Sequence, residues 1–304
     1  MAKLIHIALG STMSKPGDVV GNLAQIAAFA RQAQADGADV LLTPELSVSG
    51  YGPYPEVLAT AEQAGTGPVY QALAALARET GVVLCAGFVE AADGKRYLAH
   101  YVVYPDGAFV VQRKHRVTPA ERPLDTAVSL VPEPEAMENI GQPTELRFTY
   151  FMIHGVQCVL TICADSGITD LQQEMTAHGV ELQLLPTGAG GRREDRVTTA
   201  ELATPAGRAL YAKMLELVFF PGQSAVLDCL QYGHAMAAVN QCGYDGQRFY
   251  HLGHGTITTP MGEVPALIHG LPNLDRQRPM YTHAVVDVAD RLTATDSNGA
   301  TVCN

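Results

Sequence analysis

The sequence predicts an α/β fold built on a mixed β-sheet, and three observations support this prediction. The chain has 304 residues, of which 47% are hydrophobic, so it is long enough to bury a large core. From the N-terminus, short apolar runs alternate with longer segments of helical periodicity, which is the pattern of βαβ units. The turn Pro105-Asp106-Gly107 separates two β-prone runs, which indicates a hairpin and hence an antiparallel section.

The first half of the chain contains the clearest alternation. We expect strand 3–9, helix 18–36, strand 39–43, helix 67–80 and strand 82–88. The first of these helices has an apolar face that includes Ile26 and Phe29, and Gly37 is placed to end it. The two strands of the hairpin then follow at 97–104 and 108–113.

Residues 117–145 form the longest segment without periodicity, and they contain five prolines. A loop of this length inside a compact domain usually has a functional role. We therefore expect this loop to border the active site.

The second half of the chain continues the alternation. We expect strand 156–162, helix 168–178, strand 180–185, a glycine-rich turn over 188–191, helix 198–220, strands 224–229 and 235–240, and a last core strand over 255–259. No change of composition and no fixed short repeat divides the chain. The sequence thus predicts one domain over residues 1–304, with an irregular C-terminal tail from about residue 291.

Charge and hydropathy exclude two classes of partner. The net charge is −11, and no segment concentrates positive charge as binding to a phosphate backbone requires, so nucleic acid is not an expected partner. The N-terminal apolar run is too short for a signal peptide. No stretch approaches about 18 uninterrupted apolar residues, so we expect no membrane span and a cytoplasmic location.

The cysteines do not follow a disulfide or zinc pattern. None of the six belongs to a CxxC pair, and most lie in apolar segments: Cys85, Cys158, Cys163, Cys229, Cys242 and Cys303. Cys158 and Cys163 are expected on one strand with side chains on opposite faces, so they cannot easily bridge. A thiol-redox role is disfavoured because the chain lacks a resolving cysteine.

Cys163 comes directly after the apolar run Val156 to Ile162, and the polar segment Asp165-Ser166-Gly167 follows it. A helix beginning here places its thiol near a helix N-terminus, where free N–H groups and the macrodipole favour the thiolate. Considered alone, a buried core cysteine is an equally good interpretation, because free cysteine is among the most buried residue types.

Two charged residues also follow predicted strands. Glu45 comes two residues after the strand over 39–43, and Lys114 follows the strand over 108–113. Ligands and catalytic groups gather at the carboxyl ends of strands in open α/β sheets. Each residue also has an ordinary interpretation, as a surface carboxylate for Glu45 and as part of a solvated basic cluster for Lys114.

Several short motifs occur in order along the chain: Pro44-Glu45-Leu46 with Gly50-Tyr51, Arg113-Lys114-His115, Ile162-Cys163 with Asp165, the segment 238–243, Gly253-His254-Gly255-Thr256, and Pro260-Met261-Gly262-Glu263. Together they resemble the motifs of the nitrilase (carbon–nitrogen hydrolase) superfamily over about residues 3 to 290. The resemblance implies a four-layer α-β-β-α sandwich with mixed sheets, which pairs through its helices into a homodimer or larger homo-oligomer.

The same resemblance implies a catalytic set. Cys163 is the implied nucleophile, Glu45 the general base, and Lys114 the oxyanion donor together with the backbone N–H of Ala164. The family has a second glutamate that orients the lysine, and Glu121 in the segment Thr118-Pro119-Ala120-Glu121-Arg122 resembles it. Three further glutamates of the same loop remain open for this position: Glu133, Glu135 and Glu138.

Four residues near this set are expected to contact the substrate: Tyr51, Ala164, Asp165 and Gly188. The glycine-rich turn is not a phosphate loop, because no GK[ST] follows it. No cofactor and no metal are expected, since His251 and His254 lie in a strand and glycine-rich region where a helical metal pair is disfavoured.

The residues after the cysteine favour one substrate class. Many nitrilases have Trp-Glu there, whereas this chain has Ala164-Asp165 and no tryptophan. Carbamoylases of the superfamily place an arginine shortly after the cysteine, and none occurs between Cys163 and Arg192. A small linear carboxamide is therefore the favoured substrate. A nitrile, an N-carbamoyl compound and a non-enzymatic binding or scaffold module remain as alternatives.

Overall fold

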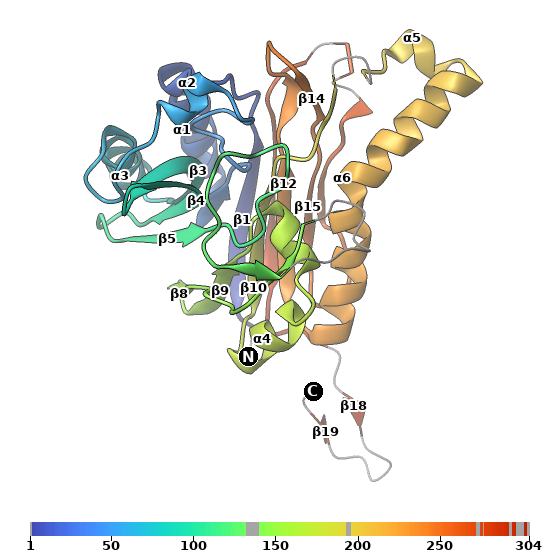
Figure 1. Ribbon diagram of the computed structural model, residues 1–304. Coiled ribbons are helices and arrows are strands. Elements are labelled where there is room, and N and C mark those ends of the chain that lie inside the picture. The colour runs from blue at the N-terminus through green and yellow to red at the C-terminus, as the bar shows by residue number, and fades with distance from the viewer. Residues whose placement is uncertain are drawn as a thin grey trace.

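Two six-stranded sheets face each other at the centre of the molecule, and helices cover their outer faces (Figure 1). The computed structural model describes residues 2–131, 140–192, 196–271, 274–275, 277–291, 294–295 and 301–302. Helices α1 (Val19–Asp36) and α3 (Pro68–Thr80) cover one sheet, and α4 (Leu171–Ala177) and α6 (Pro205–Tyr232) cover the other. The expected four-layer α-β-β-α sandwich is confirmed.

The first sheet contains the N-terminal strands in the order β17-β1-β2-β3-β4-β5. Their bounds are β17 (Met280–Asp287), β1 (Leu4–Ser11), β2 (Val40–Leu42), β3 (Val83–Ala92), β4 (Lys95–Val103) and β5 (Phe109–Arg113). Strands β1, β2 and β3 run parallel, while the other pairings are antiparallel. The sheet is therefore mixed, as the hairpin signal predicts.

The second sheet has the order β16-β15-β12-β10-β9-β8. Its strands are β16 (Ala266–Ile268), β15 (Gly255–Thr258), β12 (Ala235–Asn240), β10 (Leu182–Thr187), β9 (Val156–Leu160) and β8 (Tyr150–Ile153). Strands β9, β10 and β12 run parallel, so their carboxyl ends lie at one edge. Shorter ladders join β11 (Gly191–Arg192), β14 (Phe249–Leu252) and β13 (Cys242–Tyr244), and β6 (Leu130–Val131) with β7 (Gln142–Pro143).

The main core lies between the sheets and depends on the two-residue period of the strands. In β12, Ala235, Ala237 and Val239 face the first sheet, whereas Met236 and Ala238 face α6. This alternation is the pattern expected for a strand whose two faces are both covered. Helix α1 is closed by the caps that its sequence provides, because the Asp18 side chain accepts from Gly21 N and Gly37 has a left-handed conformation.

The strand expected over 224–229 is wrong, because these residues belong to α6. A short apolar run fits either a strand or a buried helix, and here Ala225 and Cys229, four residues apart, form a helical face against the second sheet. The single helix expected over 198–220 is instead α5 (Thr199–Leu202) followed by α6. The Thr204 side chain accepts from Gly207 N and caps the start of α6.

Three further expectations differ from the structure. The last core strand is β17 rather than the strand over 255–259, and β17 returns the chain to the first sheet beside β1. Helix α4 begins at Leu171, and Cys163 begins the 3-10 helix η1 (Cys163–Gly167) instead of an α-helix. Strand β9 ends at Leu160, so Cys158 and Cys163 do not share a strand. The five described cysteines are all free.

The C-terminal tail is described only in part. Strands β18 (Ala294–Thr295) and β19 (Thr301–Val302) pair there, so the tail is not wholly irregular. The other residues beyond 291 lie outside the described residues, as do 132–139 of the long loop. The prediction of a single domain over the whole chain stays a prediction. Within the described part of the chain, no helix combines the length and apolar character that crossing a membrane requires.

Candidate active site

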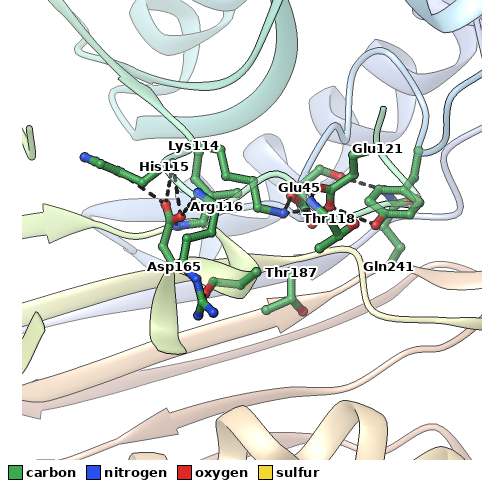
Figure 2. Close-up of polar contacts among 12 residues, drawn as sticks. Glu45, Lys114, His115, Arg116, Thr118, Glu121, Asp165, Thr187 and Gln241 are labelled. Carbon is green, nitrogen blue, oxygen red and sulfur yellow. Dashed lines mark hydrogen bonds and ion pairs between the residues drawn. The ribbon is translucent and has the colours of Figure 1, made fainter. Parts of the chain in front are cut away.

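A lysine and two glutamates form a buried charged cluster at the carboxyl edge of the two sheets. Lys114 Nζ lies 2.7 Å from Glu45 Oε1 and 2.6 Å from Glu121 Oε1 (Figure 2). All three side chains are fully buried, although such residues are rarely buried unless they are paired. The structure therefore brings together Glu45, Lys114 and Glu121, which are far apart or weakly marked in the sequence.

Both sheets hold the backbone of Glu45. The residue follows β2 of the first sheet, but its N–H donates to the Thr187 carbonyl at the end of β10, at 3.3 Å. Its own carbonyl accepts from Gln241 Nε2, just past β12, at 2.6 Å. Gly87 leaves room for this turn, because a Cβ there would lie 2.2 Å from Leu46 N. Glu45 is thus fixed across the interface between the sheets.

The turn after β5 brings Lys114 and Glu121 together. The Glu121 N–H donates to the Thr118 carbonyl at 3.0 Å, and the Thr118 N–H donates back to Glu121 Oε2 at 2.7 Å. The Tyr51 hydroxyl donates to Glu121 Oε1 at 2.9 Å. The other glutamates considered for this position, Glu133, Glu135 and Glu138, lie outside the described residues.

The two carboxylates differ in how their oxygens are used. Both oxygens of Glu121 accept hydrogen bonds. Glu45 Oε1 accepts from Lys114, whereas Glu45 Oε2 is buried and has no hydrogen-bond partner among the described residues. A buried carboxylate oxygen without a donor is unfavourable unless another group uses it. Glu45 is therefore the carboxylate that can take up a proton.

Cys163 lies beside the Glu45 carboxylate. The Gly188 N–H lowers the pKa of the Cys163 thiol, and the thiol in turn lowers the pKa of the Glu45 carboxyl, so these groups are neighbours. Cys163 has a φ of 49°, a left-handed conformation that is strained for a residue with a Cβ. Strain of this kind is common where a fold must present a reactive side chain.

Asp165 holds the turn that contains Cys163. Its buried carboxylate accepts from the N–H groups of Ile162, His115 and Arg116, at 3.2, 3.1 and 2.8 Å. It therefore ties the start of η1 to the segment that follows Lys114, as Figure 2 shows for His115 and Arg116. Substrate contact was expected for Asp165, but its oxygens are occupied by backbone donors, so its place is behind the site.

Burial and charge set the protonation of these groups. Burial raises the pKa of Glu45 to about 8, although Lys114 lowers it, and the Glu121 carboxylate adds to the increase. Burial lowers the pKa of Lys114, but Glu121 and Glu45 outweigh this effect and raise it well above its usual value. The lysine therefore stays charged, and the glutamate titrates close to neutral pH.

The expectation that a helix N-terminus stabilises the Cys163 thiolate is wrong. Burial raises the pKa of the Cys163 thiol well above its usual value, and the neighbouring Glu45 carboxylate raises it further. The five-residue η1 replaces the α-helix that was expected to stabilise the thiolate. Cys163 consequently requires a base to become a nucleophile, and Glu45 is the adjacent base.

The expected contacts Tyr51, Ala164 and Gly188 lie beside this set. A Cβ on Gly188 would lie 2.4 Å from the Tyr51 ring and 2.7 Å from Glu45 Oε2, so the backbone of this turn passes directly over the site. The carbonyl of Ala164 accepts from Arg116 Nη1 at 3.0 Å. The Tyr51 ring also packs edge-on against Phe249 and His251, with ring centroids 5.5 Å apart in both pairs.

No group of three or more His, Cys, Asp or Glu side chains suited to a metal ion is found among the described residues. His251 instead contacts the Ala189 carbonyl through Nδ1 at 3.1 Å. Sequence reasoning missed Thr187, Gln241 and this contact of His251, because no short motif marks residues whose partners lie far away in the chain.

Comparisons with known proteins agree with this arrangement. Residues 6–268 match the family described as Carbon-nitrogen hydrolase. A curated hydrolase from Pseudomonas protegens, named "Hydrolase in pqqF 5'region", is 27% identical and covers 87% of this chain and 79% of its own. An (R)-stereoselective amidase from Pseudomonas sp. is 25% identical, over 73% of this chain and 77% of its own.

Solved structures show the same fold. A mutant amidase from Nesterenkonia sp. AN1 in complex with butyramide has a TM-score of 0.69 at 20% identity and covers 94% of each chain. Another mutant of that amidase, with the acetamide moiety of fluoroacetamide covalently added at its active-site cysteine, has a TM-score of 0.68 at 21% identity. It covers 94% of this chain and 92% of that chain.

Proposed function

We propose that this chain, which belongs to the carbon-nitrogen hydrolase family, cleaves the C–N bond of a small linear carboxamide through a thioester on Cys163. The chain is a hydrolase of the amidase and nitrilase type. The observation that carries the proposal is the buried Glu45 carboxylate, whose Oε2 accepts no hydrogen bond from a nitrogen or oxygen donor among the described residues and which lies beside the Cys163 thiol. The neighbouring thiol can donate its proton to such an oxygen during the reaction.

The acylation half-reaction follows from this contact. The Cys163 thiol gives its proton to Glu45 as the sulfur attacks the amide carbon, which forms a C–S bond and moves the carbonyl electrons onto oxygen. The Lys114 ammonium and the Ala164 N–H stabilise this oxyanion. When the oxyanion collapses, the C–N bond breaks and Glu45 returns the proton to the leaving nitrogen, so that ammonia or an amine departs.

Deacylation uses the same groups with water as the nucleophile. Glu45 takes a proton from water while the water oxygen attacks the thioester carbon. Collapse of the second oxyanion breaks the C–S bond, releases the carboxylic acid and returns the proton to Cys163. A base with a pKa of about 8 suits both directions of proton transfer near neutral pH.

Glu121 has a positioning role in this scheme. Its oxygens accept from Lys114, Tyr51 and Thr118, so it has no free oxygen with which to accept a proton. It holds the ammonium group between the two carboxylates, and its charge keeps the lysine protonated. Substrate contact by Tyr51, Ala164 and Gly188 is part of the same proposal.

The carboxamide preference is supported by two independent considerations. The chain has Ala164-Asp165 after the cysteine and lacks the arginine of carbamoylases, as described above. Relatives and structural neighbours include an (R)-stereoselective amidase and an amidase whose mutant binds butyramide. Nitriles and N-carbamoyl compounds are the competing substrates that a test must include.

We further propose that the chain forms a homodimer or larger homo-oligomer through the helical layer of the second sheet. Leu227 of α6 is 66% exposed, and Leu267 of β16 and the nearby Val264 are 48% and 41% exposed. The segment between β15 and β16 packs on α6, where Gly262 lies against Leu230. Exposed apolar side chains gathered on one side of a molecule favour an interface.

Intact-mass spectrometry tests the proposed reaction. The protein is incubated with short aliphatic amides, the corresponding nitriles and N-carbamoyl amino acids, and both released ammonia and mass added at Cys163 are measured. We expect an acyl adduct and turnover with amides, and neither with the Cys163→Ala variant. Turnover with nitriles or N-carbamoyl compounds alone would replace the carboxamide assignment. A folded protein without adduct or turnover on any of the three would overturn the enzyme proposal.

A further inference from the structure

The turn Gly188–Gly190, which follows β10, forms one wall of the site with its backbone. A Cβ at Gly188 would lie 2.7 Å from Glu45 Oε2, and the Gly188 N–H lowers the pKa of the Cys163 thiol, so the backbone of the turn lies beside both groups. Glycines at both ends give this turn wide conformational freedom. Its position over the nucleophile must therefore be imposed by contacts with other segments.

Two buried side chains supply such contacts, and both reach the same atom. Asn240 Nδ2, at the end of β12, donates to the Ala189 carbonyl at 2.8 Å. His251 Nδ1, on β14, contacts the same carbonyl at 3.1 Å. The two side chains are 2% and 1% exposed, so water does not compete for these contacts. The peptide between the two glycines is thus held from two different strands.

This contact determines which ring nitrogen of His251 carries the proton. A carbonyl oxygen only accepts hydrogen bonds, so Nδ1 must carry the proton and donate. Burial lowers the pKa of His251, which keeps the ring neutral. Nε2 is then an acceptor, and it is buried without a hydrogen-bond partner in the described part of the chain. An unsatisfied buried acceptor is costly, so the ring is stabilised here by its Nδ1 donor and by its packing on Tyr51.

We propose that His251 is a positioning residue: with Asn240, its Nδ1–H holds the Ala189 carbonyl and thereby keeps the Gly188 N–H against the Cys163 sulfur. This inference rests on the proposed function only in taking Cys163 as the nucleophile. His251 is not a catalytic residue, because its contacts are with the turn and with Tyr51 rather than with the reacting atoms.

Three substitutions distinguish the effect of the Nδ1–H donor of His251 from the effect of its aromatic ring. His251→Phe keeps an aromatic ring but removes the Nδ1 donor. His251→Asn places an amide nitrogen near the position of Nδ1 and restores the donor. His251→Gln is the matched control, because its longer side chain places the amide near the position of Nε2 instead. Circular dichroism and thermal unfolding establish that each variant is folded.

The first measurement is the rate of alkylation of Cys163 by iodoacetamide as a function of pH, followed by peptide mass spectrometry. The groups that face the thiol are Glu45, Lys114, Glu121 and Tyr51, and all four are the same in every variant. The Gly188 N–H favours the thiolate, so we expect His251→Phe to move the profile to higher pH. At pH values below the midpoint of the profile, a shift of one pH unit lowers the alkylation rate about tenfold.

The second measurement is steady-state amide hydrolysis. We expect His251→Phe and His251→Gln to lower kcat by about ten- to a hundredfold, because a displaced turn changes the geometry around the nucleophile. His251→Asn should recover most of kcat and the wild-type alkylation profile. An unchanged profile and kcat in His251→Phe would overturn the inference, as would an Asn variant no better than Gln.

The two proposals can fail separately. Alkylation requires only an accessible thiol, so it can be measured even if no amide is hydrolysed. A shifted profile in His251→Phe that is rescued by His251→Asn, in a protein without amidase activity, supports the positioning role and rejects the proposed substrate. Normal amidase activity with an unchanged profile in all three variants rejects the positioning role alone.

Discussion

Glu45 and Glu121 are buried beside the same ammonium group, yet their local contacts give them different chemistry. Three donors satisfy Glu121, whereas one oxygen of Glu45 is left next to a thiol. Two carboxylates and one lysine would carry a net negative charge in a dry site, which is unfavourable. A raised pKa for Glu45 removes this excess, because a proton held there leaves one cation facing one anion.

The first prediction concerns activity and pH. Only ionised Glu45 can take the thiol proton, so kcat/KM for an amide should rise with pH and level off above a midpoint of about 8. Replacing Glu45 by Gln should reduce kcat/KM by about 10²- to 10⁴-fold, the range for loss of a general base. Initial rates between pH 5.5 and 10 check both statements. A wild-type profile already flat at pH 6 would contradict them.

The second prediction concerns stability and pH. The unfolded Glu45 titrates near its ordinary pKa of 4.5, and the folded one near 8, so the folded state binds an extra proton between these values. The resulting stabilisation is complete below about pH 4.5 and is lost as the pH rises to about 8. Urea unfolding should thus show a steeper fall in stability from pH 6 to 9 for wild type than for Glu45→Gln. Equal slopes would argue against a raised pKa.

The sequence predicted the charged residues of the site better than the residues that hold them. Glu45, Lys114 and Cys163 each come shortly after a predicted strand, and their order along the chain resembles the motifs of the nitrilase superfamily, so the sequence indicated that they act together. Gln241 and the carbonyl of Glu45 are 196 residues apart, and neither lies in a pattern that pairs them. Such contacts depend on how the two sheets face each other, which local periodicity does not encode.

At the scale of elements, the turn at Cys163 depends on an anchor. The Asp165 carboxylate accepts hydrogen bonds from three backbone N–H groups and so connects η1 to the segment after β5. Because Lys114 directly precedes that segment, the same carboxylate fixes the spacing between the nucleophile and the ammonium group. The element that carries the cysteine is therefore positioned by charge rather than by helix packing.

The third prediction tests this anchor. Asp165→Asn replaces one accepting oxygen by a donor that faces backbone N–H groups, which should destabilise the fold by about 1.5–3 kcal/mol, as expected for hydrogen bonds to a charged group. We also expect a lower kcat, because the turn that carries the nucleophile moves. Urea denaturation and steady-state kinetics measure the two effects.

Asp170→Asn serves as the matched control for this substitution, because Asp170 is exposed at the start of α4 and makes no side-chain cap. It should leave both stability and kcat within error of wild type. If Asp165→Asn instead raises KM without loss of stability, the residue contacts substrate, and its assignment as an anchor is wrong.

Element boundaries were least predictable where two periodicities compete. The run from Ser224 to Cys229 is short and apolar, and the preceding Pro221-Gly222 favours the end of a helix, yet α6 continues to Tyr232. The packing of Ala225 and Cys229 against Met236 and Ala238 of the second sheet outweighs the local preference. Strand β17 was missed for a related reason, because His283 interrupts its apolar character while β1 supplies its hydrogen bonds.

At the scale of the whole molecule, the site exists only where the two sheets meet. Glu45 comes from the first sheet, Cys163 and Gly188 follow strands of the second, and the contacts of Thr187 and Gln241 join them. Any shift of one sheet against the other changes the distance between base and nucleophile. The proposed assembly would use α6, which packs on the outer face of the second sheet, away from the face that meets the first sheet.

The fourth prediction tests that assembly. Size-exclusion chromatography with light scattering should give a mass of at least two chains for wild type. Leu227→Lys places a charge among the exposed apolar side chains of α6 and should shift the population toward a single chain. Val20→Lys is the control, since Val20 is 82% exposed but lies on α1, over the other sheet. A mass unchanged by Leu227→Lys, or lowered equally by Val20→Lys, would place the interface elsewhere, and a monomeric wild type would reject self-association.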